Sequence, residues 1–161
     1  MTRKSHETVA FFAGSFNPFT IGHASVVERA LAVFDKVVIA IGVNALKSDI
    51  CDADERWRAI DRVYAAVADR VQVITYTGLT VEAAAAHGAT ALLRGVRTVA
   101  DFEYERTIAD VNRRISGLET VMIYALPGHE CVSSSVVREL MSYDRDVSEF
   151  LPQPVSADFG K

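Results

Sequence analysis

The order of its apolar segments constrains the fold of this chain more than any other feature. Five segments rich in β-branched and aromatic residues alternate with segments whose apolar residues recur every three or four positions, as in helices. One of the five, residues 36–43 (KVVIAIGV), is apolar almost throughout, as expected for a strand buried on both faces of a parallel sheet. Because crossovers between parallel strands are right-handed, this alternation predicts a doubly wound, five-stranded parallel sheet with helices on both faces.

The predicted elements fill most of the chain and form one α/β domain of the Rossmann-like type. We expect strands at residues 8–13, 36–43, 71–76, 89–93 and 119–126. We expect helices at residues 24–34, 52–68, 80–87, 98–116 and 133–143, and a short last turn at 147–150. Asp52 and Glu55 have the spacing of a capping box, so Asp52 is the predicted N-cap of the second helix. This single domain, residues 1–161, then has a polar leader (1–7) and a polar tail (151–161).

Composition and charge argue against several classes of protein. A chain of 161 residues suffices for one domain with a buried core, and its net charge of −4 argues against a general nucleic-acid or membrane surface. No apolar run is as long as a membrane span, and the polar start MTRKSHET has no apolar segment behind it, so we expect neither a membrane helix nor a signal peptide. Cys51 and Cys131 lack the spacing of metal ligands, and we expect free thiols in a cytoplasmic protein.

Polar residues gather immediately after the predicted strands, at the sheet edge where α/β proteins bind ligands. The segment GSFNPFTIGH, residues 14–23, follows the first strand and leads into the first helix. Free N–H groups and partial positive charge at a helix start suit a phosphate, and Gly22 leaves room for a nucleotide to approach the backbone. His23 adds a donor for phosphate oxygens. The plainer alternative is a turn shaped by Gly14 and Pro18, with His23 as a surface cap.

Similar signals follow the other strands. Arg94 and Arg97 of RGVR come directly after the fourth strand, and guanidinium groups match the geometry of phosphates. The serines at 133–135 can cap a helix or hold a polyphosphate, and Lys47 is either a solvent-facing loop residue or a phosphate contact. Tyr104 is interpreted as a packing residue. Each signal is modest alone, but together they predict a phosphate-binding site at one edge of the sheet.

Three motifs resemble those of a known enzyme superfamily. GSFNPFTIGH resembles the GxFxPxxxGH signature of the nucleotidyltransferases that share a histidine motif with class I tRNA synthetases, and SSSVVRE is similar to their second motif, ISSxxxR. Between them, LLRGVRTVADFEYE closely resembles one member family, the phosphopantetheine adenylyltransferases of coenzyme A biosynthesis. The similarity runs in order over residues 9–150. It implies an enzyme that transfers the adenylyl group of ATP to 4′-phosphopantetheine, giving dephospho-coenzyme A and pyrophosphate.

The resemblance also implies roles for individual residues. The catalytic residues would be His23 and Lys47, and the phosphopantetheine contacts would be Ser15, Lys47, Thr80 and Arg94. The ATP contacts would be Ser15, Phe16, His23, Gly95, Val96, Arg97, Glu105, His129, Glu130, Cys131, Val132, Ser133, Ser134 and Ser135. No protein metal ligand is implied, because Mg²⁺ would be bound mainly through the phosphates of ATP. The family further implies a homohexamer and feedback binding of coenzyme A.

Two alternative functions stay open. A nicotinate mononucleotide adenylyltransferase would share the two outer motifs, but its pocket would have to recognise an aromatic base, and the middle motif argues against it. A non-catalytic nucleotide-binding domain of the same fold should have lost His23 or Lys47, and this chain keeps both. Four positions depart from the residue types usual in the family and bear on substrate affinity: Asn17, Thr80, His129 and Cys131.

Overall fold

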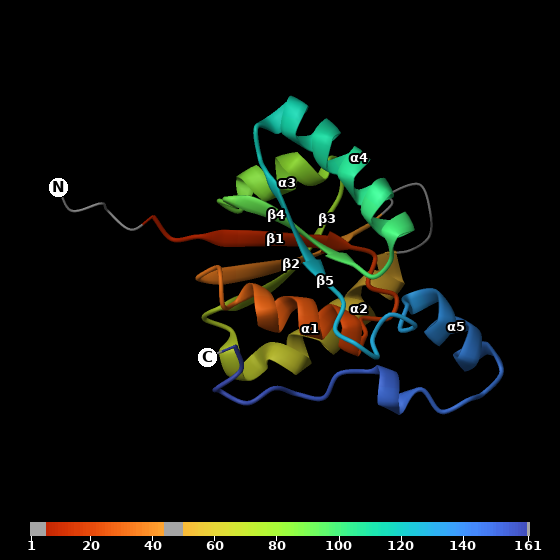
Figure 1. The fold of residues 1–161 in the computed structure, drawn as a ribbon. Helices are drawn as coiled ribbons and strands as arrows, with labels where there is room; N and C mark the ends of the chain where they lie inside the picture. Colours follow the sequence, from red (N-terminus) through yellow and green to blue (C-terminus); the bar gives the residue numbers. More distant parts are fainter. Residues whose placement is uncertain (1–5, 44–49, 161) are drawn as a thin grey trace.

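Five parallel strands form a single sheet in the order β3-β2-β1-β4-β5 (Figure 1). Their bounds are β1 (Val9–Gly14), β2 (Lys36–Gly42), β3 (Val71–Tyr76), β4 (Ala91–Val96) and β5 (Thr120–Tyr124). The computed structural model describes residues 6–43 and 50–160, and all five predicted strands are found there. The chain adds β2 and β3 on one side of β1 and then crosses to add β4 and β5 on the other, so the strand order reverses at β1.

Helices cover both faces of this sheet. α1 (Ile21–Ala30) and α2 (Ile50–Tyr64) pack on one face, and α3 (Thr80–Ala86) and α4 (Val99–Ser116) lie on the other (Figure 1). α5 (Ser134–Ser142) lies beyond the carboxyl ends of the strands. Two short 3-10 turns, Ala65–Val67 and Ser148–Phe150, follow α2 and α5. The doubly wound α/β fold that the alternation of segments predicts is therefore confirmed.

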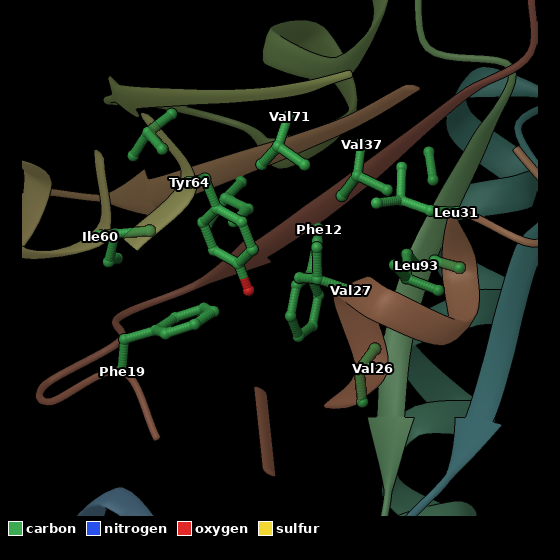
Figure 2. Close-up of a cluster of buried hydrophobic side chains, with 14 of the residues drawn as sticks. Phe12, Phe19, Val26, Val27, Leu31, Val37, Ile60, Tyr64, Val71 and Leu93 are labelled. Atoms are coloured by element: carbon green, nitrogen blue, oxygen red, sulfur yellow. The ribbon is translucent and has the colours of Figure 1, made fainter. Parts of the chain in front are cut away.

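The core has two layers because successive side chains of a strand point to opposite faces of the sheet. Phe12 of β1 lies on the face covered by α1 and α2, in one buried cluster with Val27 and Tyr64 (Figure 2). Phe11, its neighbour in sequence, is fully buried on the other face in a cluster with Val81 of α3. Each fully buried side chain of this kind stabilises the fold by roughly 1.5–3 kcal/mol. The two layers fix β1 firmly, and with it the residues that follow β1.

The C-terminal segment, predicted to be a polar tail, belongs to the first of these layers. Val155 and Phe159 pack against the core, and the ring centroid of Phe159 lies 5.6 Å from that of Tyr64. Arg70 donates to the carbonyl oxygen of Gly160 at 3.2 Å. The segment is therefore packed against the domain rather than extended from it.

Several element boundaries differ from the predictions. α1 begins at Ile21, before the predicted residue 24, because Thr20 is its N-cap and His23 completes the first turn; it ends at Ala30 rather than at 34. The prediction that Asp52 caps α2 is wrong: α2 begins at Ile50, and Asp52 lies in its first turn. There the carboxylate interacts favourably with the positive end of the helix dipole instead of capping it.

The ends of two strands separate at the point where the strand order reverses. β1 pairs with β4 up to Phe12↔Leu93, although β1 continues to Gly14. β4 continues to Val96, beyond the predicted end at residue 93, and there it pairs with β5 alone among the described strands. Arg94 is consequently a strand residue rather than a loop residue. The separated carboxyl ends of β1 and β4 lie where open α/β sheets bind ligands.

Candidate active site

A cavity of about 230 Å³, called here the first cavity, lies between the separated ends of β1 and β4. Six polar side chains from segments far apart in the sequence line it: Ser15, His23, Arg94, Arg97, His129 and Ser134. Two of its glycines lie where an added Cβ would be tightly packed. A Cβ on Gly14 would lie 3.0 Å from the Phe16 ring, and a Cβ on Gly95 would lie 3.0 Å from Cγ2 of Val26 in α1. The fold thus brings the predicted phosphate-binding residues to one cavity.

The imidazole of His23 is held in one orientation and in one tautomer. The backbone N–H of Thr20 donates to His23 Nδ1 at 3.0 Å, so Nδ1 is an acceptor and the ring proton lies on Nε2. The rings of Phe16 and Phe19 pack against the imidazole, with centroid distances of 5.1 and 5.3 Å. Burial, and then the charges of Arg97 and Arg94, lower the pKa of His23 from 6.5 to about 4. At neutral pH His23 is therefore an uncharged donor with its N–H on Nε2.

The second motif holds the backbone of the first. The hydroxyl of Ser134 donates to the Pro18 carbonyl at 2.8 Å, and Nη1 of Arg138 donates to the Asn17 carbonyl at 2.5 Å. Ser133 is the N-cap of α5, where its hydroxyl accepts from the Val136 N–H at 3.2 Å. The start of α5 therefore lies beside the loop after β1, and its free N–H groups add positive character to this edge of the sheet.

Arg94 is fixed by an ion pair. Its Nε and Nη2 donate to the two carboxylate oxygens of Glu105, both at 2.7 Å, and its Nη1 donates to the Ala13 carbonyl at 2.5 Å. Glu105 is buried, whereas the Arg94 side chain is 33% exposed. A guanidinium carries five N–H donors, and these three bonds leave two of them for a ligand. Arg97, by contrast, pairs with Asp101 in the first turn of α4 at 3.0 Å.

A second cavity of about 170 Å³ lies on the α3 and α4 side of the same strands. Gly14 and Arg94 line both cavities, so the two adjoin across the end of the sheet. The lining of the second cavity includes Ile108 of α4. Thr80 also lines it and is bound through its hydroxyl to that of Tyr76 at 2.8 Å. Two adjoining cavities with a cation at the junction can hold two phosphate-bearing molecules with their phosphates in contact.

The structure places the predicted site residues in three groups. The first cavity brings together Ser15, Phe16, His23, Arg94, Gly95, Val96, Arg97, His129 and Ser134. The second is lined by Thr80, Glu105 and again Arg94. Neither lining includes Glu130, Cys131, Val132, Ser133 or Ser135. Lys47 lies outside the described residues.

Sequence reasoning missed several residues of this region. Tyr104, interpreted as a packing residue, is 65% exposed and lines the second cavity with Asn112, so it is not packed in the core of this chain. These two side chains are eight residues apart on α4 and therefore lie on neighbouring faces of the helix. Their spacing alone does not indicate a shared cavity, because that depends on how α4 is placed against the sheet. Arg138 is the arginine of the second motif, and that motif could have indicated it. Thr20, three residues before His23, is a residue type that favours helix N-caps, and that preference could have indicated the start of α1.

Within residues 6–43 and 50–160, no group of three or more His, Cys, Asp or Glu side chains could hold a metal ion. No helix in the same ranges is both long and apolar enough to cross a membrane.

Comparison with known proteins identifies relatives along nearly the whole chain. A family model described as cytidylyltransferase-like matches residues 11–140. Phosphopantetheine adenylyltransferases from Porphyromonas gingivalis, Bacteroides thetaiotaomicron and Flavobacterium johnsoniae are 53%, 46% and 40% identical to this chain. These alignments cover 91%, 89% and 91% of the chain and 95% of each relative.

Solved structures share the fold at much lower identity. A bifunctional NMN adenylyltransferase/ADP ribose pyrophosphatase from Francisella tularensis superposes with a TM-score of 0.65 at 14% identity, covering 91% of this chain and 44% of that one. A lipopolysaccharide core biosynthesis protein from Thermoplasma volcanium gives a TM-score of 0.52 at 13% identity, covering 75% and 98%. Both similarities concern the fold alone.

The close relatives and the family model agree with the three motifs and with the cavity at the ends of β1 and β4. The predicted enzyme class and family are confirmed. The chain belongs to the phosphopantetheine adenylyltransferases, nucleotidyltransferase enzymes of coenzyme A biosynthesis.

Proposed function

We propose that this chain transfers the adenylyl group of ATP to 4′-phosphopantetheine, with ATP in the first cavity and the pantetheine arm in the second. The proposal rests on the junction of the two cavities, both of which Arg94 lines, and on the uncharged imidazole of His23 in the first cavity, on which the charges of Arg97 and Arg94 act. The names of the close relatives support the choice of substrates.

The reaction needs no proton acceptor from the protein. A phosphate oxygen of 4′-phosphopantetheine, already ionised at neutral pH, attacks the α-phosphorus of ATP in line. A new P–O bond forms, the bond from the α-phosphorus to the bridging oxygen breaks, and pyrophosphate leaves. Negative charge spreads over the oxygens of the transferring group, so catalysis consists of positioning and of fixed donors. A neutral His23 with its proton on Nε2 is suited to that role.

Each polar group that lines the two cavities then has a specific role. His23 and the start of α1 donate to oxygens of the transferring phosphate, while Arg97 and the start of α5 hold the departing polyphosphate. Arg94 holds the phosphate of 4′-phosphopantetheine, with the arm extending past Thr80. By family resemblance we assign Lys47 to the same transferring phosphate. The first cavity is lined by cationic and neutral groups, which fits Mg²⁺ that enters with ATP and is held by phosphates and water, where it neutralises phosphate charge.

We further propose that this chain forms a homo-oligomer, which by family resemblance would be a hexamer. We also propose that the enzyme acts in the cytoplasm, where ATP is abundant. Tyr104, Ile108, Val111 and Ile115 form an exposed apolar stripe along α4, which supports an interface with another copy. Coenzyme A contains both an adenine nucleotide and a pantetheine arm, so we expect it to compete with both substrates.

A pyrophosphate-release assay tests the function directly. With ATP present, we expect release with 4′-phosphopantetheine and none with nicotinate mononucleotide. His23→Ala should lower kcat by roughly 10²–10³ with ATP affinity nearly unchanged, because it removes one preorganised donor. His87→Ala, an exposed histidine at the end of α3, is the matched control. ATP binding by the unaltered chain without pyrophosphate release would instead favour a nucleotide-binding domain without catalysis.

A further inference from the structure

Arg56, a residue of α2 outside both cavities, makes a contact that the reaction described above does not use. Its Nη1 donates to the carbonyl oxygen of Ser15 at 2.5 Å, and its Nε donates to the Asp52 carbonyl one turn earlier in α2 at 3.1 Å. Arg56 is half-buried and lines a separate, mostly apolar pocket behind the loop after β1, which also contains Phe16 and Phe19. The guanidinium thus reaches the loop from α2, whereas His23 of α1 lines the first cavity.

The Ser15 carbonyl determines where the next N–H points. In a trans peptide the carbonyl oxygen and the following N–H point in opposite directions. The bond to Arg56 turns the Ser15 carbonyl toward α2, so the N–H of Phe16 points away from α2, and both residues line the first cavity. In the described part of the chain no hydrogen-bond acceptor is found for this N–H. It is therefore available to an oxygen of a bound phosphate.

The loop has an unfavourable backbone conformation at Phe16. Phe16 has a φ of 46°, in the left-handed region that a residue with a bulky side chain adopts only at a cost. Rotation of the Ser15–Phe16 peptide would relieve that cost and would turn the N–H away from the cavity. The Arg56 guanidinium opposes the rotation, and its own position is fixed by its second bond, to Asp52.

We propose that Arg56 is a positioning residue for adenylyl transfer: it holds the Ser15–Phe16 peptide so that the Phe16 N–H donates to the phosphate that is transferred. The proposal rests on the proposed function, because it assigns the transferring phosphate to the first cavity. Arg56 touches no substrate in this scheme and acts through the backbone alone.

Steady-state kinetics of Arg56 variants test the proposal, once the unaltered chain has shown pyrophosphate release; its absence there would refute the proposed function instead. Arg56→Ala should lower kcat on the order of 10- to 100-fold, with the KM for ATP changed by less than about threefold, because the donor acts mainly in the transition state. Arg56→Lys, which keeps one charged donor, should retain more of the rate. Arg58→Ala, an exposed arginine of the same helix, should leave both constants unchanged.

Chemical rescue separates positioning from a merely structural role. Guanidinium ion added to folded Arg56→Ala should restore part of kcat without changing its thermal midpoint, because a free donor can occupy the space beside the Ser15 carbonyl. A folded Arg56→Ala variant with unaltered kcat would overturn the proposal. The proposal would also be overturned if Arg56→Ala and Arg56→Lys both lost rate in proportion to their loss of thermal stability and if guanidinium did not restore that rate.

Discussion

The imidazole of His23 is kept uncharged by its surroundings, and this has a consequence for stability. Its pKa in the folded chain is lowered from 6.5 to about 4, so the unfolded chain binds more protons between these two values. The stability that His23 contributes is complete above pH 6.5 and is lost as the pH falls toward 4. We expect this loss to approach about 3 kcal/mol of the free energy of unfolding.

His23→Gln isolates that contribution. Glutamine at this position of a helix can still accept the Thr20 N–H, as in a capping box, but it does not titrate. Urea unfolding between pH 4.5 and 7.5 should therefore show a weaker loss of stability on acidification for His23→Gln than for the unaltered chain. His87→Gln, at an exposed histidine, should follow the unaltered chain. Parallel curves for His23→Gln and the unaltered chain would contradict the buried, neutral state of His23.

The two arginines near His23 should differ in the substrate that they hold. Arg94 lines both cavities, whereas Arg97 lines only the first. We expect Arg94→Ala mainly to raise the KM for 4′-phosphopantetheine and Arg97→Ala mainly to raise the KM for ATP, each by roughly 10-fold or more because a charged hydrogen bond is lost. Initial rates with one substrate varied at a time measure this. The reverse selectivity would show that the two cavities have been assigned to the wrong substrates.

At the scale of elements, the start of α4 orients the residues that face the second cavity. Thr98 is its N-cap, and its hydroxyl accepts from the Asp101 N–H at 3.1 Å. Thr98→Ala should lower the free energy of unfolding by about 1 kcal/mol, as loss of an N-cap usually does. Thr107→Ala, at an exposed threonine in the middle of the same helix, should change it by less than about 0.5 kcal/mol. Urea denaturation of the two variants gives the comparison, and equal effects would show that Thr98 does not act as a cap.

The strands and helices were predictable because each has a characteristic apolar pattern, periodic in most segments and continuous in β2. Contacts between elements set their ends. The capping rule looks for an acidic or amide side chain at the third helical position, and α1 uses His23 there instead. Arg94 has the charge of a loop residue, yet it continues β4 because Glu105, eleven positions later, neutralises it. The prediction that the site residues lie close together rested only on their positions at the ends of strands. The division of the site into two cavities could not be predicted in this way, because it depends on where β1 and β4 stop pairing, at Phe12↔Leu93.

At the scale of the whole molecule, α4 is a long helix that the fold leaves largely uncovered. Among its described residues only Glu105 is buried, although the helix spans Val99–Ser116. The stripe of Tyr104, Ile108, Val111 and Ile115 recurs every three or four positions and is 38–65% exposed at each. A continuous apolar stripe on a surface helix is typical of an interface. Tyr104 and Ile108 also line the second cavity, so a neighbouring copy on this stripe would cover the bound arm.

Assembly of the oligomer and binding of 4′-phosphopantetheine should therefore be coupled. Val111→Glu with Ile115→Glu should lower the mass measured by light scattering and raise the KM for 4′-phosphopantetheine more than the KM for ATP, because charges cannot be buried unpaired and the cavity then loses its cover. Thr107→Glu, on the neighbouring charged face of the same helix, should change neither quantity. A monomeric unaltered chain would refute the interface. An unchanged KM for 4′-phosphopantetheine in a dissociated variant would show that the second cavity is complete within one copy. The apolar stripe would then have a role in assembly alone.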